Sequence, residues 1–405
     1  MSDQRKSLKV PGFPSSLSFG GYAGTDGAGD LYTHLSSDES TKRTVQLAAE
    51  VEAKVGKSVL PILVAYTTNL SLGDPCIRLQ NETEIQHGFS NLILSLQIAV
   101  KTAKEKGGRE VPAAYIMNPE FLGTCQQQNL SPDFAMPVRG ALRGALEYRA
   151  VKGDIPEDIT NTLKGYVSAV NWVIRLVARD ITFGWQANIW GVGNATWIYD
   201  QSKTEADLRE IANQTVDYIK SLGVYTGAYA PDFLAIDRYE ADDLTIRGYG
   251  NGYCYSPSEW ERFYDFCSNL NSGVDVPVMP WQIPASRLPY KTEAVADLEE
   301  EKWGTGGTYL FGDERIGKDL QNVNPEILGL EPAGMMGMKD VKTLLGKKQT
   351  FDLSRPAYEG LAQKGIFAVL LGGGATTGIA STIGQTGGWT QEKLAGYERN
   401  PVTLT

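Results

Sequence analysis

The chain of 405 residues is poor in the side chains on which several enzyme classes depend. It has only two histidines, His34 and His87, which leaves few ways to build a Ser-His-Asp triad, a Cys-His pair or a multi-histidine metal site. Its four cysteines lie far apart and form no Cys-x-x-Cys pair, so we expect reduced, structural thiols and no zinc centre. We therefore predict neither a bound metal nor a cofactor.

An excess of positive charge and a long apolar run are also missing. The net charge of -10 and the pI near 5.0 disfavour binding to nucleic acid, which requires clustered Lys and Arg. No apolar run approaches the roughly 20 residues that cross a bilayer, and the first residues lack the apolar core of a secretory signal. We expect no nucleic-acid or membrane partner, and a protein that is cytoplasmic or secreted with a signal outside this chain.

What the sequence does have is a regular alternation of short apolar runs with longer amphipathic segments, which is typical of βα units. Eight apolar runs are predicted as strands: Leu17–Gly21, Val59–Tyr66, Ala113–Met117, Ile181–Ala187, Phe233–Ile236, Val276–Trp281, Thr308–Phe311 and Ile366–Leu371. Five segments between them are predicted as helices: Thr41–Lys54, Glu84–Lys106, Glu157–Ala178, Lys203–Leu222 and Pro257–Leu270. In the second helix an apolar stripe places Asn91 and Ser95 on the opposite, polar side.

Eight strands that alternate with helices favour an α/β fold in which residues 1–405 form a single (β/α)8 TIM barrel. An open doubly wound sheet is the alternative, and it is disfavoured because the chain has no nucleotide-binding fingerprint at a switch point. The connections after the third and seventh predicted strands, about 118–181 and 313–366, are long. We expect both to elaborate the active-site face of the barrel.

Side chains suited to a sugar follow the predicted strands. Trp and Tyr stack on the apolar face of a pyranose, while amides, carboxylates and Arg bind its hydroxyl groups. The predicted substrate-binding residues are Tyr22, Asp26, Tyr66, Trp185, Gln186, Asn188, Trp190, Arg238, Trp281 and Gln282. For each Trp the alternative is packing in the core or barrel rim, and for Arg238 an ion pair that turns outward is the favoured alternative.

Four acids are candidates for catalysis. Asp237 ranks first because it directly ends the apolar run Phe233–Ile236, where a carboxyl group is least freely solvated. Glu240, Glu120 and Asp313 follow. Cleavage of a glycosidic bond requires two carboxyl groups, one protonated to assist the leaving oxygen and one ionised as base or nucleophile. Desolvation among aromatic rings raises the pKa of a carboxyl group, as the general acid requires.

Eight βα units with acids and aromatic residues at the strand ends resemble the barrel glycoside hydrolases. The resemblance covers most of the chain at the level of architecture, and it implies a hydrolase that cleaves O-glycosyl bonds of a poly- or oligosaccharide. The large retaining clan carries an Asn-Glu pair after the fourth strand and a Glu after the seventh. This chain instead has Gln186-Ala187-Asn188 and Asp313-Glu314 at those places, so no single family is identified.

Two other functions stay open. The glycine-rich segment Leu371–Gly378 follows the last predicted strand, where barrel enzymes of sugar-phosphate metabolism hold phosphate on backbone N–H groups, so a sugar-phosphate lyase or isomerase is one alternative. Aldolase chemistry through a Schiff base is disfavoured because no strand end supplies a Lys. The second alternative is a barrel that binds carbohydrate without catalysis.

Overall fold

The structure is a computed structural model, and it describes residues 14–21, 29–108, 110–238, 254–295, 303–331, 340–347, 351–372 and 386–404. The chain divides into two compact units. Unit 1 comprises residues 1–22, 195–212 and 236–405, and unit 2 comprises residues 23–194 and 213–235. Two elements, α7 (Glu205–Ser221) and β5 (Phe233–Asp237), continue from one unit into the other. The expectation of one catalytic domain spanning residues 1–405 stays a prediction.

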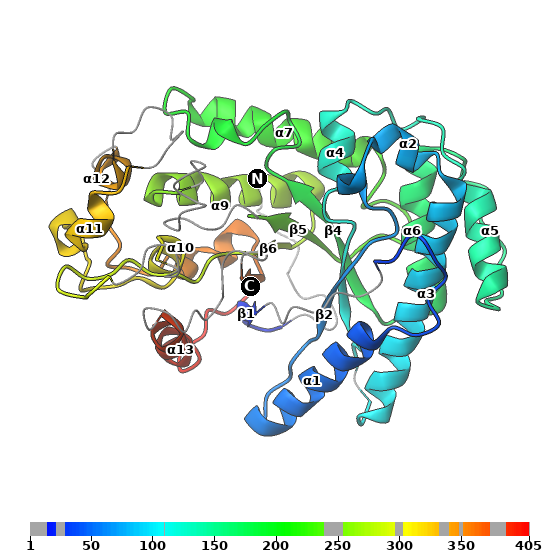
Figure 1. The fold of residues 1–405 in the computed structure, drawn as a ribbon, viewed down its shortest axis with the longest axis horizontal. Coiled ribbons are helices and arrows are strands. Elements are labelled where there is room, and N and C mark those ends of the chain that lie inside the picture. The colour runs from blue at the N-terminus through cyan, green and yellow to red at the C-terminus, as the bar shows by residue number, and fades with distance from the viewer. Residues whose placement is uncertain are drawn as a thin grey trace, which may run out of the picture. The chain divides into compact units, whose positions relative to one another are not determined.

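Unit 2 contains parallel strands in the order β2 (Ile62–Ala65), β3 (Ala114–Met117), β4 (Thr182–Asn188) and the first part of β5. These strands are almost entirely buried, which is typical of parallel sheets covered by helices. The helices of unit 2 are α1 (Glu39–Val55), α2 (Pro75–Leu79), α3 (Glu82–Glu105), α4 (Phe121–Gln127), α5 (Val138–Tyr148) and α6 (Leu163–Val177), with the 3-10 turn η1 (Leu70–Leu72). Helix α3 packs against α1, α5 and α6 (Figure 1).

Unit 1 contains β6 (Val278–Trp281), β7 (Ala368–Leu371) and β1 (Ser18–Gly21). Strand β7 pairs in parallel with β1, and it lies beside β6, where Phe367 N donates to Val278 O at 3.1 Å. The helices of unit 1 are α9 (Pro257–Val274), α10 (Gly306–Phe311), α11 (Pro325–Leu328), α12 (Val341–Leu345) and α13 (Thr386–Tyr397), with the 3-10 turns η2 (Thr196–Ile198), η3 (Leu320–Asn322), η5 (Ala357–Gly360) and η6 (Ala362–Lys364). The long connection between β6 and β7 has an apolar core of its own, which includes Leu288, Trp303 and Ile316.

Side-chain caps mark the starts of several helices. Asp38 accepts a hydrogen bond from Thr41 N at the start of α1, and Asn81 accepts one from Glu84 N at the start of α3. Ser256 and Glu259 form a capping box at the start of α9, where the sequence Ser-Pro-x-Glu predicts a helix start. These local bonds explain why the predicted and observed starts of α9 agree.

The predicted seventh strand, Thr308–Phe311, is wrong, because these residues belong to helix α10. A short apolar run cannot distinguish a buried strand from a buried helix by periodicity. In the helix, Thr308 Oγ1 accepts a hydrogen bond from Leu288 N at 2.8 Å, and Phe311 packs in the core. The described residues therefore show a mixed α/β fold with parallel sheets, and they do not confirm a complete (β/α)8 barrel.

Both long connections contain helices. The residues after β3 form α4, α5 and α6, and those after α10 include α11 and α12. Helix α3 also differs from expectation, because Asn91 and Ser95 are fully buried rather than on a polar surface. Ser95 bonds with Thr41 of α1 and Tyr115 of β3, and the amide of Asn91 donates to the carbonyl of Asp30. Neighbouring segments thus cover both sides of this helix.

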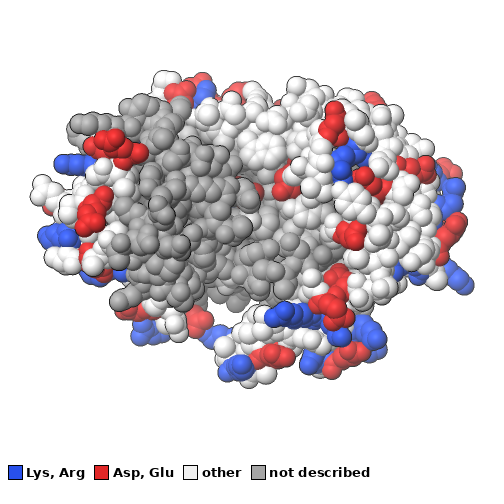
Figure 2. Space-filling model, viewed as in Figure 1, with Lys and Arg blue, Asp and Glu red and all other residues white. Residues whose placement is uncertain are grey.

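The surface drawn in Figure 2 carries charges of both signs. Among the described residues on this face, Lys and Arg side chains are intermixed with Asp and Glu rather than gathered in one patch (Figure 2). Within the described part of the chain, no helix combines the length and the apolar character needed to cross a membrane.

We predict that Gly88→Ala destabilises the fold although alanine favours helices. A Cβ at Gly88 in α3 would lie 2.1 Å from the carbonyl oxygen of Thr67, so the backbone has to shift. Overpacking of this kind costs about 1–3 kcal/mol, which exceeds the gain of about 1 kcal/mol from helix propensity. Gly388→Ala in α13 is the matched control, since nothing lies within 4 Å of its Cβ. Equal urea midpoints for the two variants would contradict the prediction.

Candidate functional site

The ends of β2 and β3 are joined by the side chain of Asn118. This residue directly follows β3 with a left-handed φ of 47°, which Asn tolerates better than most residues. Its Oδ1 accepts a hydrogen bond from Thr67 N at 2.7 Å, and its Nδ2 donates to Thr67 Oγ1 at 2.9 Å. The Thr67 hydroxyl also bonds with the Tyr166 hydroxyl of α6. We call the pair Asn118 and Thr67 the strand-end clamp.

Two predicted site residues lie next to the strand-end clamp. Tyr66 precedes Thr67, and Glu120 follows Asn118 by two residues at the N-terminus of α4. The structure brings them together, with the Tyr66 hydroxyl 3.4 Å from Glu120 Oε1, a long hydrogen bond. Glu120 Oε2 is shielded from solvent and has no hydrogen-bond partner among the described residues. A buried carboxylate oxygen without a partner is costly, so it points to a functional role.

Burial controls the ionisation of Glu120. It raises the pKa of this carboxyl group by more than the hydrogen bonds from its own backbone and from Tyr66 lower it. The pKa of Glu120 is raised, whereas those of Asp30, Glu293 and Asp313 are lowered. A carboxylic acid that keeps its proton to higher pH is suited to general acid catalysis.

The prediction that Trp185 stacks on a sugar is wrong. Trp185 in β4 is fully buried, and its Nε1 donates to Asn171 Oδ1 of α6 at 2.8 Å. Its ring also packs against Phe121, with 5.4 Å between the ring centroids. Strand residues alternate between two faces, and Trp185 lies on the face that α6 covers. It is a core residue.

The other predicted residues of β4 and its loop have different surroundings. Gln186 is fully buried, and Asn188 is 2% exposed. Asn188 lies so close to α4 that a Cβ at Gly123 would be 2.5 Å from its Oδ1, an atom without a hydrogen-bond partner among the described residues. Trp190 is half-buried in the loop after the strand. These three residues remain candidates for binding substrate.

Asp237 and Arg238 lie at the end of β5 in unit 1. Asp237 is buried at 9% exposure, and Arg238 N donates to Trp281 O of β6 at 3.2 Å, which aligns the two strand ends. The expectation that Arg238 turns outward is wrong, because its side chain is 1% exposed and its guanidinium carbon lies 3.6 Å from the centroid of the Tyr255 ring. This is a desolvated cation–π contact.

Sequence reasoning missed a buried ion pair in unit 1. Glu259 in α9 is fully buried, and its Oε1 lies 3.1 Å from Lys347 Nζ and accepts a hydrogen bond from Gln201 at 3.0 Å. The only sequence signal at Glu259 is its place in the capping box after Ser256. That signal predicts a helix start and says nothing of a lysine that is distant in the sequence. Such a pair is costly to break from one side.

Trp281 and Gln282 end β6. Both are buried, with 5% and 9% exposure, and Gln282 has a left-handed φ of 54°. The indole N–H of Trp281 has no hydrogen-bond partner among the described residues. Backbone strain of this kind and unpaired polar groups gather at functional sites, so both residues remain candidates for binding.

Asp313 differs from expectation in place and in chemistry. It follows helix α10 rather than a strand, and both of its oxygens accept hydrogen bonds from Arg315. Burial raises the pKa of Asp313, but the hydrogen bonds and charge of Arg315 outweigh it and bring the pKa below its usual range. Asp313 is thus an ionised ion-pair partner, which does not suit a proton donor.

Three predicted residues, Tyr22, Asp26 and Glu240, lie outside the described residues, as does the glycine-rich segment beyond Gly372. Within the described part of the chain, no group of three His, Cys, Asp or Glu side chains is arranged to hold a metal ion.

No protein-family model and no curated protein matches the chain. Among solved structures, CcCel6C from Coprinopsis cinerea, a glycoside hydrolase family 6 enzyme, matches with 13% identity over 82% of this chain and 85% of that chain, at a TM-score of 0.34. A mutant of the cellobiohydrolase CcCel6C in its closed form matches with 15% identity over 67% of this chain, at a TM-score of 0.33. That match spans only 61% of the cellobiohydrolase chain.

A methyltransferase from Methanosarcina mazei also matches, with 11% identity over 87% of this chain and 99% of that chain, at a TM-score of 0.31. The first two matches are glycoside hydrolases, the class that the sequence resembles. Because proteins with different activities match at similarly low TM-scores, these likenesses do not decide the function.

We predict that Asn118→Ala removes the strand-end clamp and destabilises unit 2. The variant loses the hydrogen bonds between the Asn118 side chain and Thr67 and leaves buried groups unpaired, which costs about 2 kcal/mol beyond the strain of a left-handed alanine. Asn129→Ala is the matched control, because Asn129 has a φ of 53° but is exposed. Free energies of unfolding from urea titrations measure the difference. Equal losses in the two variants would show that the clamp contributes nothing.

We further predict that Glu120 makes stability depend on pH. Its pKa is higher in the folded chain than in the unfolded one, so the folded state loses stability as the pH rises from the ordinary glutamate value of about 4.3 through the raised pKa. Glu120→Gln cannot ionise and should lack this loss, so it gains stability relative to the unmodified chain toward pH 7. Urea unfolding across this range, with exposed Glu147→Gln as control, measures it. Parallel pH curves for the unmodified chain and Glu120→Gln would rule it out.

Proposed function

We propose that the chain is a glycoside hydrolase that acts on a poly- or oligosaccharide, with Glu120 as the general acid. The observation that carries the proposal is the carboxyl group of Glu120, which has a raised pKa and lies at a strand end next to Tyr66. Cleavage of a glycosidic bond requires a carboxylic acid that is still protonated near neutral pH and can donate to the leaving oxygen. The upward shift of the Glu120 pKa is in the direction that this requirement demands.

The surroundings of Glu120 support the proposal. Asn118 forms the turn that leads to Glu120, and its side chain holds Thr67, the residue that follows Tyr66. The Tyr66 hydroxyl is a neutral partner, so it constrains the Glu120 carboxyl group without stabilising the ionised form as a cation would. A general acid has to be held in place while it keeps its proton.

The reaction also needs a second, ionised carboxyl group. The sequence candidates for it are Asp237, Glu240 and Asp313. Asp237 remains the first of these, because it is buried at the end of β5. Asp313 is ionised but already bound on both oxygens by Arg315, which leaves it little capacity to act as a base.

A panel of neutral polysaccharides tests the proposal, with reducing ends as the readout. We expect the unmodified chain to hydrolyse at least one member, and Glu120→Gln and Asp237→Asn each to lose about 100-fold or more of kcat while they still bind the glycan. Exposed Glu147→Gln and Asp133→Asn are the matched controls and should keep full activity.

The outcomes separate the competing functions. Binding of glycan without hydrolysis by any form would favour a carbohydrate-binding protein and contradict an enzyme. Hydrolysis that survives Glu120→Gln at the unmodified rate would remove Glu120 from the mechanism. Turnover that is inhibited by inorganic phosphate and confined to phosphorylated sugars would favour a sugar-phosphate enzyme.

The pH dependence of kcat/KM gives a further prediction. Because Glu120 has to be protonated to act as an acid, activity should fall on the alkaline side of its raised pKa. In Glu120→Gln this alkaline limb should vanish from the residual activity. An alkaline limb that is unchanged in the variant would assign the titration to another group.

A further inference from the structure

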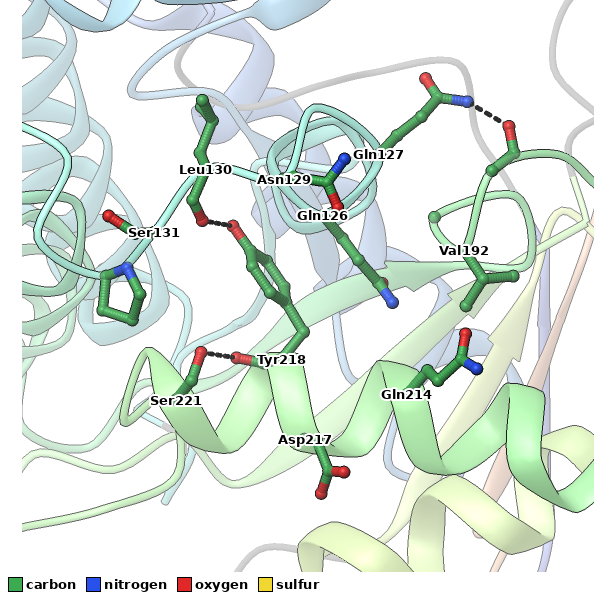
Figure 3. A pocket seen from close by; sticks show the side chains of 13 residues that line it. Gln126, Gln127, Asn129, Leu130, Ser131, Val192, Gln214, Asp217, Tyr218 and Ser221 are labelled. Carbon is green, nitrogen blue, oxygen red and sulfur yellow. Dashed lines mark hydrogen bonds between the residues drawn. The ribbon is translucent and has the colours of Figure 1, made fainter.

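A cavity of about 580 Å³ lies in unit 2, away from the strand-end clamp. Its walls come from the C-terminal end of α4, the segment that follows it, the loop after β4 and residues 214–221 of α7 (Figure 3). Pockets that bind small ligands have volumes of roughly 300–1,000 Å³, so this cavity has a suitable size.

Carboxamide side chains dominate the polar wall of the cavity. They are Gln126 and Gln127 from α4, Asn129 just after it, and Gln214 from α7. Asp217 is the only charged residue among those that line the cavity, and no Lys, Arg or His lines it. The wall is therefore rich in hydrogen-bonding groups and carries no positive charge.

Hydrogen bonds hold much of this wall in place. Gln127 Nε2 donates to Gly193 O at 2.6 Å, which ties the loop after β4 to the end of α4. The Tyr218 hydroxyl donates to Leu130 O at 3.0 Å across the cavity wall (Figure 3). A Cβ at residue 191 would lie 2.6 Å from Gln126 Oε1. The loop after β4 can approach Gln126 this closely because residue 191 is glycine. These contacts hold in place the segments that carry the amide side chains.

We infer that this cavity binds a segment of a neutral glycan. A carboxamide donates and accepts hydrogen bonds, as a sugar hydroxyl does, so four carboxamides match a ligand that carries a hydroxyl group on almost every carbon. Asp217 adds an acceptor for a pair of hydroxyl groups. An anionic ligand is disfavoured, because the wall offers it a carboxylate and no cation. A peptide ligand is disfavoured because the cavity wall has few apolar side chains against which the apolar side chains of a peptide could pack.

The cavity is distinct from the proposed acid. Glu120 precedes α4, and Gln126 and Gln127 lie at the other end of that helix, which is about 10 Å long at 1.5 Å per residue. The inference does not rest on the proposed function, since binding in the cavity requires no cleavage. A glycan held here would increase the local concentration of substrate if the chain is a hydrolase.

Calorimetric titration of the full chain tests the inference. To prevent turnover, all forms carry Glu120→Gln, and the probes are neutral tetrasaccharides of β-1,4-glucan, β-1,4-mannan and α-1,4-glucan. We expect the double variant Gln127→Ala/Gln214→Ala to bind at least one probe about tenfold more weakly than the parent, since each lost hydrogen bond lowers the affinity. The matched control is Gln128→Ala/Asn213→Ala, which changes exposed neighbours that do not line the cavity and should bind as the parent does.

Three results would overturn the inference: binding by the double variant equal to that of the control, no binding of any probe by the parent, or tighter binding of a neutral tetrapeptide than of every glycan. These results are separate from the test of hydrolysis. If the unmodified chain cleaves no polysaccharide but the double variant loses affinity, the cavity binds glycan and the proposed activity fails. If cleavage occurs and the double variant binds like the control, the inference fails and the activity stands.

Discussion

The hydrogen bonds between Asn118 and Thr67 fix the part of unit 2 on which the proposed chemistry depends. They join the ends of two neighbouring parallel strands, and each partner adjoins or nearly adjoins a residue of the candidate site: Thr67 follows Tyr66, and Asn118 precedes Glu120 by two residues. The left-handed backbone at Asn118 turns the chain from β3 into α4. This turn fixes the position of the Glu120 backbone at the start of α4. The side-chain amide of Asn118 therefore stabilises a strained turn, holds the ends of β2 and β3 together and helps to position Glu120.

Glu120 and Asp313 illustrate how the surroundings decide what a carboxyl group can do. Burial acts on both in the same direction, because it disfavours the ionised form. Asp313 gains a guanidinium partner in Arg315, whose hydrogen bonds and charge exceed the effect of burial. Glu120 gains only a distant tyrosine hydroxyl and its own backbone, so burial dominates. The pKa values of these two carboxyl groups therefore shift in opposite directions.

The alternation of apolar runs and helices predicts most of the strands, since seven of the eight expected runs contain a strand. The failure at Thr308–Phe311 arises because a run of four residues is too short to show the period of a helix or a strand. The burial of Trp185 does leave a signal in the sequence, because β4 alternates with a period of two. Phe183, Trp185 and Ala187 form its apolar face, which is the face that α6 covers, while Gln186 and Asn188 lie on the other face. Arg238 and Glu259 depend on Tyr255 and Lys347, and such distant pairs leave no local pattern.

Helix α4 connects the two parts of unit 2 that we associate with carbohydrate, and it does so with different chemistry at each end. At its N-terminus the helix dipole favours negative charge, yet the pKa of Glu120 is raised, so burial there outweighs the pull of the dipole toward ionisation. At its C-terminus lie the amides of Gln126 and Gln127, which are neutral and do not titrate. The contribution of these two amides to binding should therefore not depend on pH, in contrast to that of the carboxylate of Asp217.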